Sequence, residues 1–211
     1  MIRNVLLSKE TRPIDTYNLK NVPNDKVAEI IKSNGDLQDH KTNLKCDMTS
    51  WRFHQEHPLI VKLTDAITEI VSEDTKPYKH ILLDCWGAVY RKGDYATPHF
   101  HLPCSISFVY FVKTPKGSSP LVFDNTFAYD KKKKKYKDKP FSIYPKDGQL
   151  IIFTSDTTHS VSKSTIDEER IIISGNYFYL PEREFAFTPS LTEKWSASLN
   201  ALKNARFGGK K

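Results

Sequence analysis

Two histidines separated by one residue, His99 and His101, open the apolar segment YATPHFHLPCSISFVYFV (residues 95–112). In an extended strand, side chains at positions i and i+2 point to the same face, so both imidazoles would point the same way. Pro98 and Pro103 restrain the backbone on either side of the pair. Two imidazoles directed at one point can bind iron, zinc, copper or nickel. Taken alone, however, the pair fits half-buried structural histidines better.

A third histidine and an arginine, later in the chain, favour the metal interpretation. His159 follows an apolar run and a polar turn in GQLIIFTSDTTHSVSKSTIDEERIIIS (residues 148–174), and Arg170 begins the next apolar run. Each of them alone would be an ordinary turn or strand-end residue. A planar guanidinium can bind a carboxylate through two hydrogen bonds. Together with the first two histidines, these residues predict a metal with open positions beside a pocket for a small dicarboxylate.

The segments that must position these residues are short and strand-like. Apolar, β-branched and aromatic residues are concentrated in six runs, and Pro, Gly and Asp punctuate the sequence between them. The runs are residues 80–90, 105–113, 120–125, 141–145, 148–154 and 170–180. Because no segment between them is long and periodic enough for a helix, they predict an antiparallel sandwich or barrel.

Helical periodicity precedes and follows this β-rich region. Residues 22–35 have Asn24 as the expected N-cap and a stop signal at the end, and residues 57–74 repeat the apolar spacing of a helix. Residues 41–55 between them are irregular and in part strand-like. Residues 190–209 begin with a capping box and carry an apolar stripe. We therefore expect mainly β structure with flanking helices.

The domain organisation follows from this order of elements. We expect a single domain over residues 1–211, with helical or irregular support in residues 1–78 and the β-core in residues 79–180. Residues 181–211 would form a C-terminal helix and a basic tail. No run approaches the roughly 18 apolar residues of a membrane span, and the first residues are too short and too polar for a signal peptide.

The cysteines indicate the cellular compartment, and the net charge indicates the class of partner. Three widely spaced cysteines, Cys46, Cys85 and Cys104, suggest neither a disulfide framework nor a zinc pair, which fits a reducing, cytoplasmic location. The net charge is +7, and much of the excess comes from the lysine-rich loop at residues 130–140. Such a run is usually a solvated segment, so nucleic acid is an unlikely partner. The run would suit an acidic partner equally well.

Two sequence segments resemble the Fe(II)/2-oxoglutarate-dependent oxygenases, in particular their prolyl-4-hydroxylase-like branch. YRKGDYATPHFH (residues 90–101) resembles the first ligand segment, in which a tyrosine, a glycine and a second tyrosine precede HxD. Residues 145–176 resemble the second, in which a glycine turn, an apolar strand, the distal histidine and an arginine follow in order. With RIIISGN (residues 170–176), the chain is closer still to a group of these oxygenases common in bacteriophages and marine bacteria. The resemblance covers roughly residues 40 to 180.

The resemblance implies a fold, cofactors and site residues. The fold would be a double-stranded β-helix (jelly-roll) core, and the chemistry would use Fe(II), 2-oxoglutarate and O2. His99 and His159 would bind iron, and Arg170 would bind the distal carboxylate of 2-oxoglutarate. Further polar residues would surround the pocket: Tyr90, Ser107 and Tyr110 at the cosubstrate, and Asn176 on the substrate side. For the tyrosines, core packing with the hydroxyl at a rim is an equal alternative.

The chain departs from the family pattern at one ligand. The usual triad is two histidines and one carboxylate, and His101 stands where the carboxylate belongs. We expect His101 to be the third ligand. Alternatively, His101 turns away, and water or an acidic residue such as Asp124 or Asp156 completes the metal shell. The substitution leaves the identity of the metal open, because three histidines also suit zinc or nickel.

The implied reaction is hydroxylation of a substrate C–H bond, with succinate and CO2 as co-products. The primary substrate is unidentified, and a peptide or protein, of the prolyl type or another, is favoured. If a phage encodes the chain, the location would be the host cytoplasm. Because histidines bind metals only when deprotonated, activity should fall as pH drops through their titration range.

Two other functions stay open. A cupin-like metal protein or dioxygenase without 2-oxoglutarate would keep the three histidines but would not need Arg170. A non-catalytic, basic β-sandwich that binds nucleic acid or a virion component would need the lysines 131–135 and not the histidines.

Overall fold

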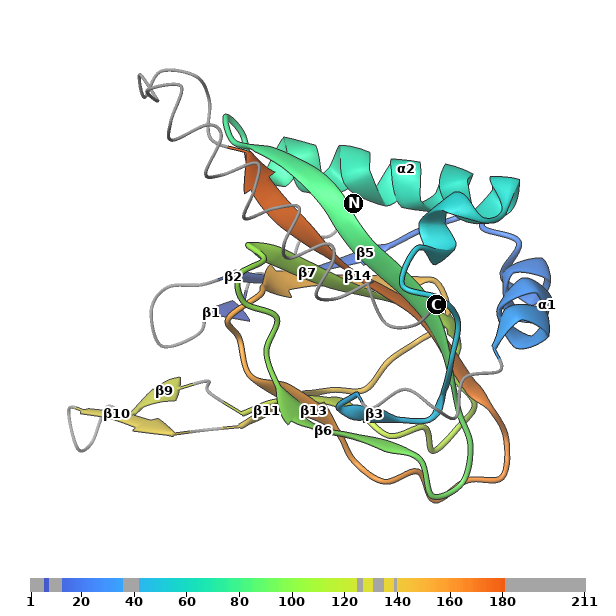
Figure 1. Cartoon of the computed structure of the whole chain (residues 1–211). Helices are drawn as coiled ribbons and strands as arrows, with labels where there is room; N and C mark the ends of the chain where they lie inside the picture. Colours follow the sequence, from blue (N-terminus) through green and yellow to red (C-terminus); the bar gives the residue numbers. More distant parts are fainter. Residues whose placement is uncertain are drawn as a thin grey trace.

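The computed structural model describes residues 6–7, 13–35, 42–124, 127–130, 135–138 and 140–180. It confirms a mainly β fold in which two antiparallel sheets face each other and two helices flank one of them (Figure 1). The predicted C-terminal helix and basic tail lie outside the described residues. Within the described part of the chain, the helices are too short or too polar to cross a membrane.

The described elements follow the predicted order closely. The helices are α1 (Asn24–Asn34), the 3-10 turn η1 (Phe53–Gln55) and α2 (Pro58–Asp74). The strands before and within the first half of the core are β1 (Leu6–Leu7), β2 (Pro13–Asn18), β3 (Leu44–Lys45), β4 (Asp47–Met48), β5 (Lys79–Tyr90), β6 (Tyr95–His99) and β7 (Ile106–Lys113). The remaining strands are β8 (Leu121–Phe123), β9 (Phe127–Asp130), β10 (Lys135–Asp138), β11 (Phe141–Ile143), β12 (Gln149–Thr154), β13 (His159–Val161) and β14 (Arg170–Leu180).

The strand order is that of a jelly-roll. The larger sheet has the order β1-β2-β12-β7-β14-β5-β4, and the smaller sheet has the order β11-β8-β13-β6-β3. Consecutive strands of the core therefore alternate between the sheets, with β5 and β7 in the larger one and β6 and β8 in the smaller one. Figure 1 shows α1 and α2 on the outer face of the larger sheet, so its inner face is left to the smaller sheet.

Alternation along the long strands separates two hydrophobic cores. On β14, Ile171 and Ile173 belong to the cluster beneath the helices, whereas Ile172 belongs to the cluster between the sheets. On β5, Val89 faces the helices, and Trp86 and Tyr90 face the smaller sheet. Because successive strand side chains point to opposite faces, Arg170 at the start of β14 shares the inner face with Ile172. The fold thereby directs a guanidinium between the sheets.

In the larger sheet, the Phe108 ring and the Asp84 backbone lie so close to residue 175 that only glycine fits there. A Cβ atom at Gly175 would lie 2.7 Å from the backbone oxygen of Asp84 and 2.7 Å from Cε1 of Phe108. Gly175 is the β14 residue paired with Cys85 of β5 and with Phe108 of β7. The missing side chain lets the Phe108 ring pack against the centre of the sheet.

The structure corrects two details of the N-terminal region. Asn24 is the first residue of α1 and not its N-cap, and its side-chain oxygen accepts a hydrogen bond from the Tyr110 hydroxyl at 2.8 Å. The N-terminal support is also not only helical or irregular, because β2 pairs with β12 in the larger sheet. The strand-like character expected within residues 41–55 is confirmed by β3 and β4.

The lysine-rich segment is more regular than the expected loop. β9 and β10 pair as an antiparallel hairpin in which Lys135 is opposite Asp130. Figure 1 shows this hairpin projecting away from the two sheets, beside β11. Residues 131–134 lie outside the described part, so the predicted role of the lysine run stays a prediction.

Candidate metal centre and cosubstrate pocket

The three predicted histidines converge between the two sheets. Their candidate ligand atoms all lie within 4.8 Å of one another. His99 ends β6 and is directly paired with His159, which begins β13. His101 lies just beyond β6, and its Nε2 atom is 3.3 Å from Nε2 of His159. Antiparallel pairing therefore brings together side chains that the sequence separates widely.

Hydrogen bonds fix the orientation of two of the rings. Nδ1 of His99 is 2.7 Å from the backbone oxygen of Thr97, and Nδ1 of His159 is 2.9 Å from that of Thr157. Since a carbonyl oxygen can only accept, each Nδ1 must carry the proton and donate it. Each Nε2 then keeps its lone pair. This is the arrangement in which a backbone carbonyl orients a metal-binding imidazole.

The surroundings keep these histidines neutral. Burial lowers the pKa of His99, and burial together with the neighbouring His99 lowers the pKa of His159 to about 3. Removing a charged group from water disfavours its charged form, which for histidine is the protonated form that does not bind metals. The loss of activity expected on acidification should therefore begin below the ordinary histidine range.

Arg170 is buried in the same cavity without a counter-charge. Its side chain is 2% exposed, and Nε, Nη1 and Nη2 have no hydrogen-bond partner. The guanidinium carbon lies 4.9 Å from the centre of the Tyr90 ring and 5.3 Å from that of Phe111. Burial lowers the pKa of Arg170. A buried guanidinium with every donor unused is costly unless a ligand pairs with it, and a carboxylate is its natural partner.

The cavity that joins Arg170 to the histidines is lined from both sheets. Its lining residues are Leu44, Trp86, Tyr90, Ala96, His99, His101, Val109, Leu121, His159, Val161, Arg170, Ile172 and Ser174. Apart from the histidines and the arginine, most of them are apolar. Such a wall excludes water and strengthens every charge interaction inside. The residues present thus fit a divalent metal at one end and an anionic group at the other.

Tyr90, which the resemblance places at the cosubstrate, lines the cavity and lies against Arg170. The β5–β14 register pairs Tyr90 directly with Arg170. The Tyr90 hydroxyl shares a hydrogen bond with the Cys46 thiol, and burial raises the pKa of Tyr90 well above its ordinary value. Its ring faces the guanidinium, and its hydroxyl is already engaged. A contact between Tyr90 and a ligand in the cavity would therefore be made by the ring.

Ser107 and Tyr110, the other two predicted pocket residues, do not line the cavity. Tyr110 belongs to the cluster beneath the helices, on the opposite face of the larger sheet. Ser107 is on the inner face but hydrogen-bonds Asn176 at 2.7 Å and Ser155 at 2.8 Å. Strand alternation explains Tyr110, because Val109 and not its neighbour faces the pocket. Asn176, expected on the substrate side, binds buried Asp84 at 2.6 Å.

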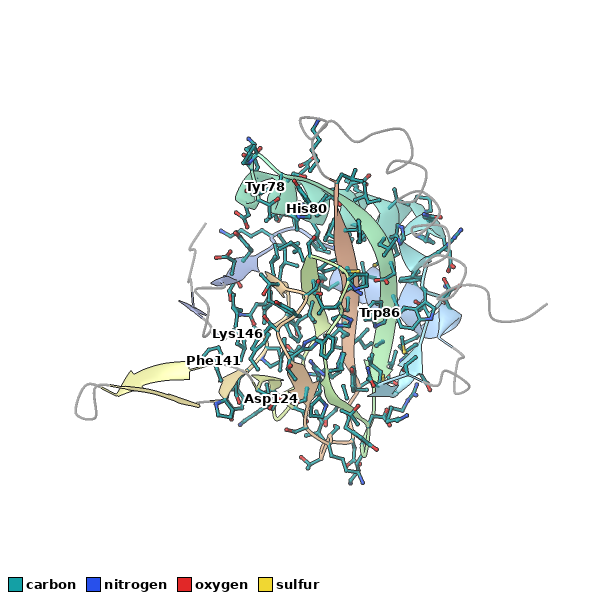
Figure 2. The ribbon with its side chains drawn as sticks, turned by 60° about the vertical axis from the view of Figure 1, so that its left-hand side comes forward. Tyr78, His80, Trp86, Asp124, Phe141 and Lys146 are labelled. Atoms are coloured by element: carbon teal, nitrogen blue, oxygen red, sulfur yellow. The ribbon has the colours of Figure 1, made fainter. Side chains whose placement is uncertain are left out.

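Neither acidic alternative joins the histidine cluster among the described residues. A carboxylate oxygen of Asp124 accepts a hydrogen bond from Ser160 at 3.1 Å. Figure 2 shows Asp124 close to the part of the chain from which the β9–β10 hairpin leaves. Asp156 is likewise outside the cluster and does not line the cavity. The geometry therefore favours His101 as the third nitrogen.

Sequence reasoning missed Trp86. Its indole Nε1 is buried without a hydrogen-bond partner, and its ring centroid lies 6.0 Å from that of His101. Figure 2 shows Trp86 well inside the molecule, whereas Tyr78 and His80 lie towards one end of it. The signal was present in residues 80–90, because alternation places Trp86 on the same face as Tyr90.

Comparisons with known proteins agree with this geometry. Residues 84–176 match the family model described as "Putative 2OG-Fe(II) oxygenase". No curated protein matches the chain at a significant level. The matched segment includes the three histidines, Arg170 and Trp86.

Solved structures of low sequence identity share the fold. A prolyl-4-hydroxylase from Pseudomonas putida is 13% identical with a TM-score of 0.59, covering 80% of this chain and 94% of its own. The viral collagen prolyl hydroxylase of Paramecium Bursaria Chlorella virus-1, in complex with 2OG, is 16% identical with a TM-score of 0.55, covering 78% and 94%. HygX from Streptomyces hygroscopicus, with nickel, 2-oxoglutarate and hygromycin B bound, is 8% identical with a TM-score of 0.59, covering 80% and 84%.

The family match and the jelly-roll architecture confirm the resemblance seen in the two ligand segments. The cavity adds the chemistry that such enzymes require, a metal-binding cluster and a site for an anion. Over residues 84–176 this chain is similar to the 2OG-Fe(II) oxygenases, and it shares its fold with solved enzymes of that kind.

Proposed function

We propose that His99, His101 and His159 bind Fe(II), and that Arg170 binds the distal carboxylate of 2-oxoglutarate. The observation that carries the assignment is the buried, unpaired guanidinium in the same cavity as three converging imidazoles. A cupin-like metal protein without 2-oxoglutarate would have no use for that guanidinium. Its burial without a partner would then be an uncompensated cost.

The protein's own residues would bind the metal and the cosubstrate, orient them and keep water out of the cavity. Bound iron with 2-oxoglutarate and O2 supplies the oxidation that hydroxylates a C–H bond and releases succinate and CO2. The backbone oxygens of Thr97 and Thr157 orient the two histidine rings whose Nδ1 protons they accept. Arg170 fixes one end of the cosubstrate, so that its other end reaches the metal in a single orientation.

We propose a peptide or protein as the primary substrate. Phe100 and Leu102, which flank His101, are 56% and 55% exposed. Apolar side chains that are exposed close together can form a patch that a partner covers. They lie one residue on either side of the proposed metal ligand His101. Two of the similar structures are prolyl hydroxylases, and a third is a prolyl hydroxylase in complex with a peptide from Trichoplax adhaerens.

We propose that the enzyme works in a reducing compartment. Cys46, Cys85 and Cys104 are not joined in disulfides, and Cys85 and Cys104 are buried. We propose a cytoplasmic enzyme that works as one domain, with residues 1–78 supporting the core in which the site lies.

The test is 2-oxoglutarate turnover in wild type and three variants. Purified protein with Fe(II) and a peptide library should convert 2-oxoglutarate to succinate, and His159→Ala and Arg170→Ala should each reduce this at least a hundredfold. His80→Gln is the matched control, because His80 is a partly buried histidine elsewhere on β5 and should retain full turnover. Succinate formation that survives in His159→Ala would eliminate the proposal. Unaffected 2-oxoglutarate turnover in Arg170→Ala would show that another residue binds the distal carboxylate, and wild-type protein that binds metal but forms no succinate would point to a metal protein without 2-oxoglutarate.

A further inference from the structure

A row of buried polar side chains crosses the inner face of the larger sheet beside the cavity. The strands β12, β7, β14 and β5 are neighbours in that order. Each contributes one member that is at most 1% exposed: Ser155 just beyond β12, Ser107 of β7, Asn176 of β14 and Asp84 of β5. The row is the layer directly beyond the cavity wall, because the strand residues two positions away line the cavity, namely Val109, Ser174 and Trp86.

The hydrogen bonds along the row all run in one direction. The Ser107 hydroxyl donates its single proton to Oδ1 of Asn176 at 2.7 Å, so the 2.8 Å contact with Ser155 must be donated by Ser155. Nδ2 of Asn176 donates in turn to Oδ1 of Asp84 at 2.6 Å. Every donor thus points towards the carboxylate, and hydrogen bonds in a chain that ends at a charged group strengthen one another. The row therefore ties Ser155 to three strands of the sheet.

The backbone of Ser155 connects the two segments that carry His101 and His159. Its carbonyl oxygen accepts from the N–H of His101 at 2.6 Å, and its own N–H donates to the oxygen of Ser105 at 3.0 Å. Both ends of the loop from His101 to Ser105 are therefore bound to this one residue. Ser155 also begins the turn that leads to His159, whose Nε2 lies 3.3 Å from that of His101. A shift of Ser155 would change the separation of the two imidazoles.

We infer that this row positions His101 through Ser155, and that the hydroxyl of Ser107 is required for it. Strand pairing of β12 ends at Thr154, so the side-chain row is what ties the position of Ser155 to the centre of the sheet. The inference rests on the proposed function, because it takes His101 as a metal ligand. It goes beyond that function by giving a role to buried groups that do not line the cavity.

The first measurement needs no metal. Ser107→Thr and Ser107→Val are an isosteric pair of variants, of which only Ser107→Thr keeps the hydroxyl. The amide of His101 should be protected from hydrogen exchange in metal-free protein, because it donates to Ser155. We expect this amide to exchange at least about tenfold faster in Ser107→Val than in Ser107→Thr, the effect of losing one buried hydrogen bond on a local opening. Exchange followed by NMR measures it.

The second measurement is the binding of Co(II), whose visible spectrum reports the geometry of its ligands. Removing a group that orients a metal ligand typically weakens metal binding about tenfold to a hundredfold. We therefore expect Ser107→Val to bind Co(II) at least about tenfold more weakly than Ser107→Thr, and with a different visible spectrum. In Ser107→Thr both the affinity and the spectrum should stay close to those of wild type.

Thr64→Val is the matched control for a loss of stability alone. It removes another buried hydroxyl, which donates to backbone oxygens within α2. This helix lies on the outer face of the larger sheet, away from the cavity (Figure 1). Thr64→Val should be less stable than wild type but should keep the wild-type exchange of the His101 amide and the wild-type Co(II) spectrum. Weakened packing in general would therefore not produce the expected result.

The outcomes separate this inference from the proposed function. Equal exchange of the His101 amide, or equal Co(II) affinity, in Ser107→Val and Ser107→Thr would overturn the inference and leave the oxygenase assignment intact. Wild-type protein that binds no Co(II) would overturn both. If Ser107→Val does not fold, Ser155→Ala cuts the same row at its end and keeps the backbone hydrogen bonds of residue 155. Wild-type exchange or wild-type Co(II) affinity in Ser155→Ala would likewise overturn the inference.

Discussion

His99 and His159 are directly paired residues of β6 and β13, and each donates its Nδ1 proton to a backbone oxygen two residues earlier in the chain. The same local geometry is thus repeated on two neighbouring strands. Because both rings are held in this way, the two Nε2 lone pairs face a common point before any metal arrives. Preorganised ligands lose little entropy on binding, which favours a tight site.

Replacing Arg170 by methionine should separate stability from function. The guanidinium is buried and unpaired without its ligand, so an apolar side chain of similar length should stabilise the ligand-free protein, by about 1–3 kcal/mol. The same variant should lose 2-oxoglutarate binding. Urea unfolding and 2-oxoglutarate titration of one preparation test both halves. Arg170→Met that is less stable than wild type would show that the arginine has a structural partner.

Trp86→Phe tests the unused indole donor. The substitution keeps an aromatic ring against His101 but removes the buried N–H that has no protein partner. If that donor serves a bound anion, the KM for 2-oxoglutarate should rise about tenfold to a hundredfold, the value of one hydrogen bond to a charged group. Trp51→Phe is the matched control, since Trp51 packs edge-on against Trp86 at 4.8 Å but does not line the cavity. Equal KM values in wild type and Trp86→Phe would exclude this role.

Acidification should lower the free energy of unfolding of the metal-free protein. The pKa of His159 falls from 6.5 to about 3 on folding, because burial and His99 disfavour its charged form. Between these values the unfolded state binds a proton that the folded state does not, so stability is full above pH 6.5 and declines as pH falls towards 3. The slope for this group is up to about 1.4 kcal/mol per pH unit. Denaturant unfolding of wild type and His159→Gln at pH 7 and pH 5 measures it.

The His159→Gln variant should lose less stability than wild type between these two pH values. Bound metal should not flatten the dependence in wild type, because it keeps the histidines of the folded form deprotonated while those of the unfolded form still take up protons. An equal loss in both proteins would mean that His159 does not titrate differently on folding.

Gly175→Ala should damage the sheet without touching the cavity lining. A Cβ at this position meets the Asp84 backbone oxygen and the Phe108 ring at 2.7 Å, so the strands must separate or the ring must move. We expect a loss of about 1–3 kcal/mol of stability, as for other overpacked cores. Thermal unfolding measures it, and Mn(II) affinity below the melting temperature should stay near wild type. Full stability in this variant would contradict the packing around residue 175.

The sequence by itself determined the residue types and their local directions. Alternation in residues 80–90 and 170–180 predicts long strands, and His99, His101, His159 and Arg170 are singled out by type and order alone. These features are local, because strand propensity, turn residues and side-chain period act over a few neighbours. The resemblance of two short segments to one oxygenase superfamily rests on the same local residues.

Tertiary structure decided which side chains share the cavity. Tyr110 and Ser107 lie on the expected strand, yet one faces the helices and the other is used by Asn176, because register and sheet face depend on partners distant in sequence. Trp86 lines the cavity for the same reason, because the register and face of β5 depend on its partner strands. The pairing of β2 with β12 and the neutral state of His159 also depend on burial between elements. Only the folded chain reveals that Arg170 faces the histidines with every donor unused.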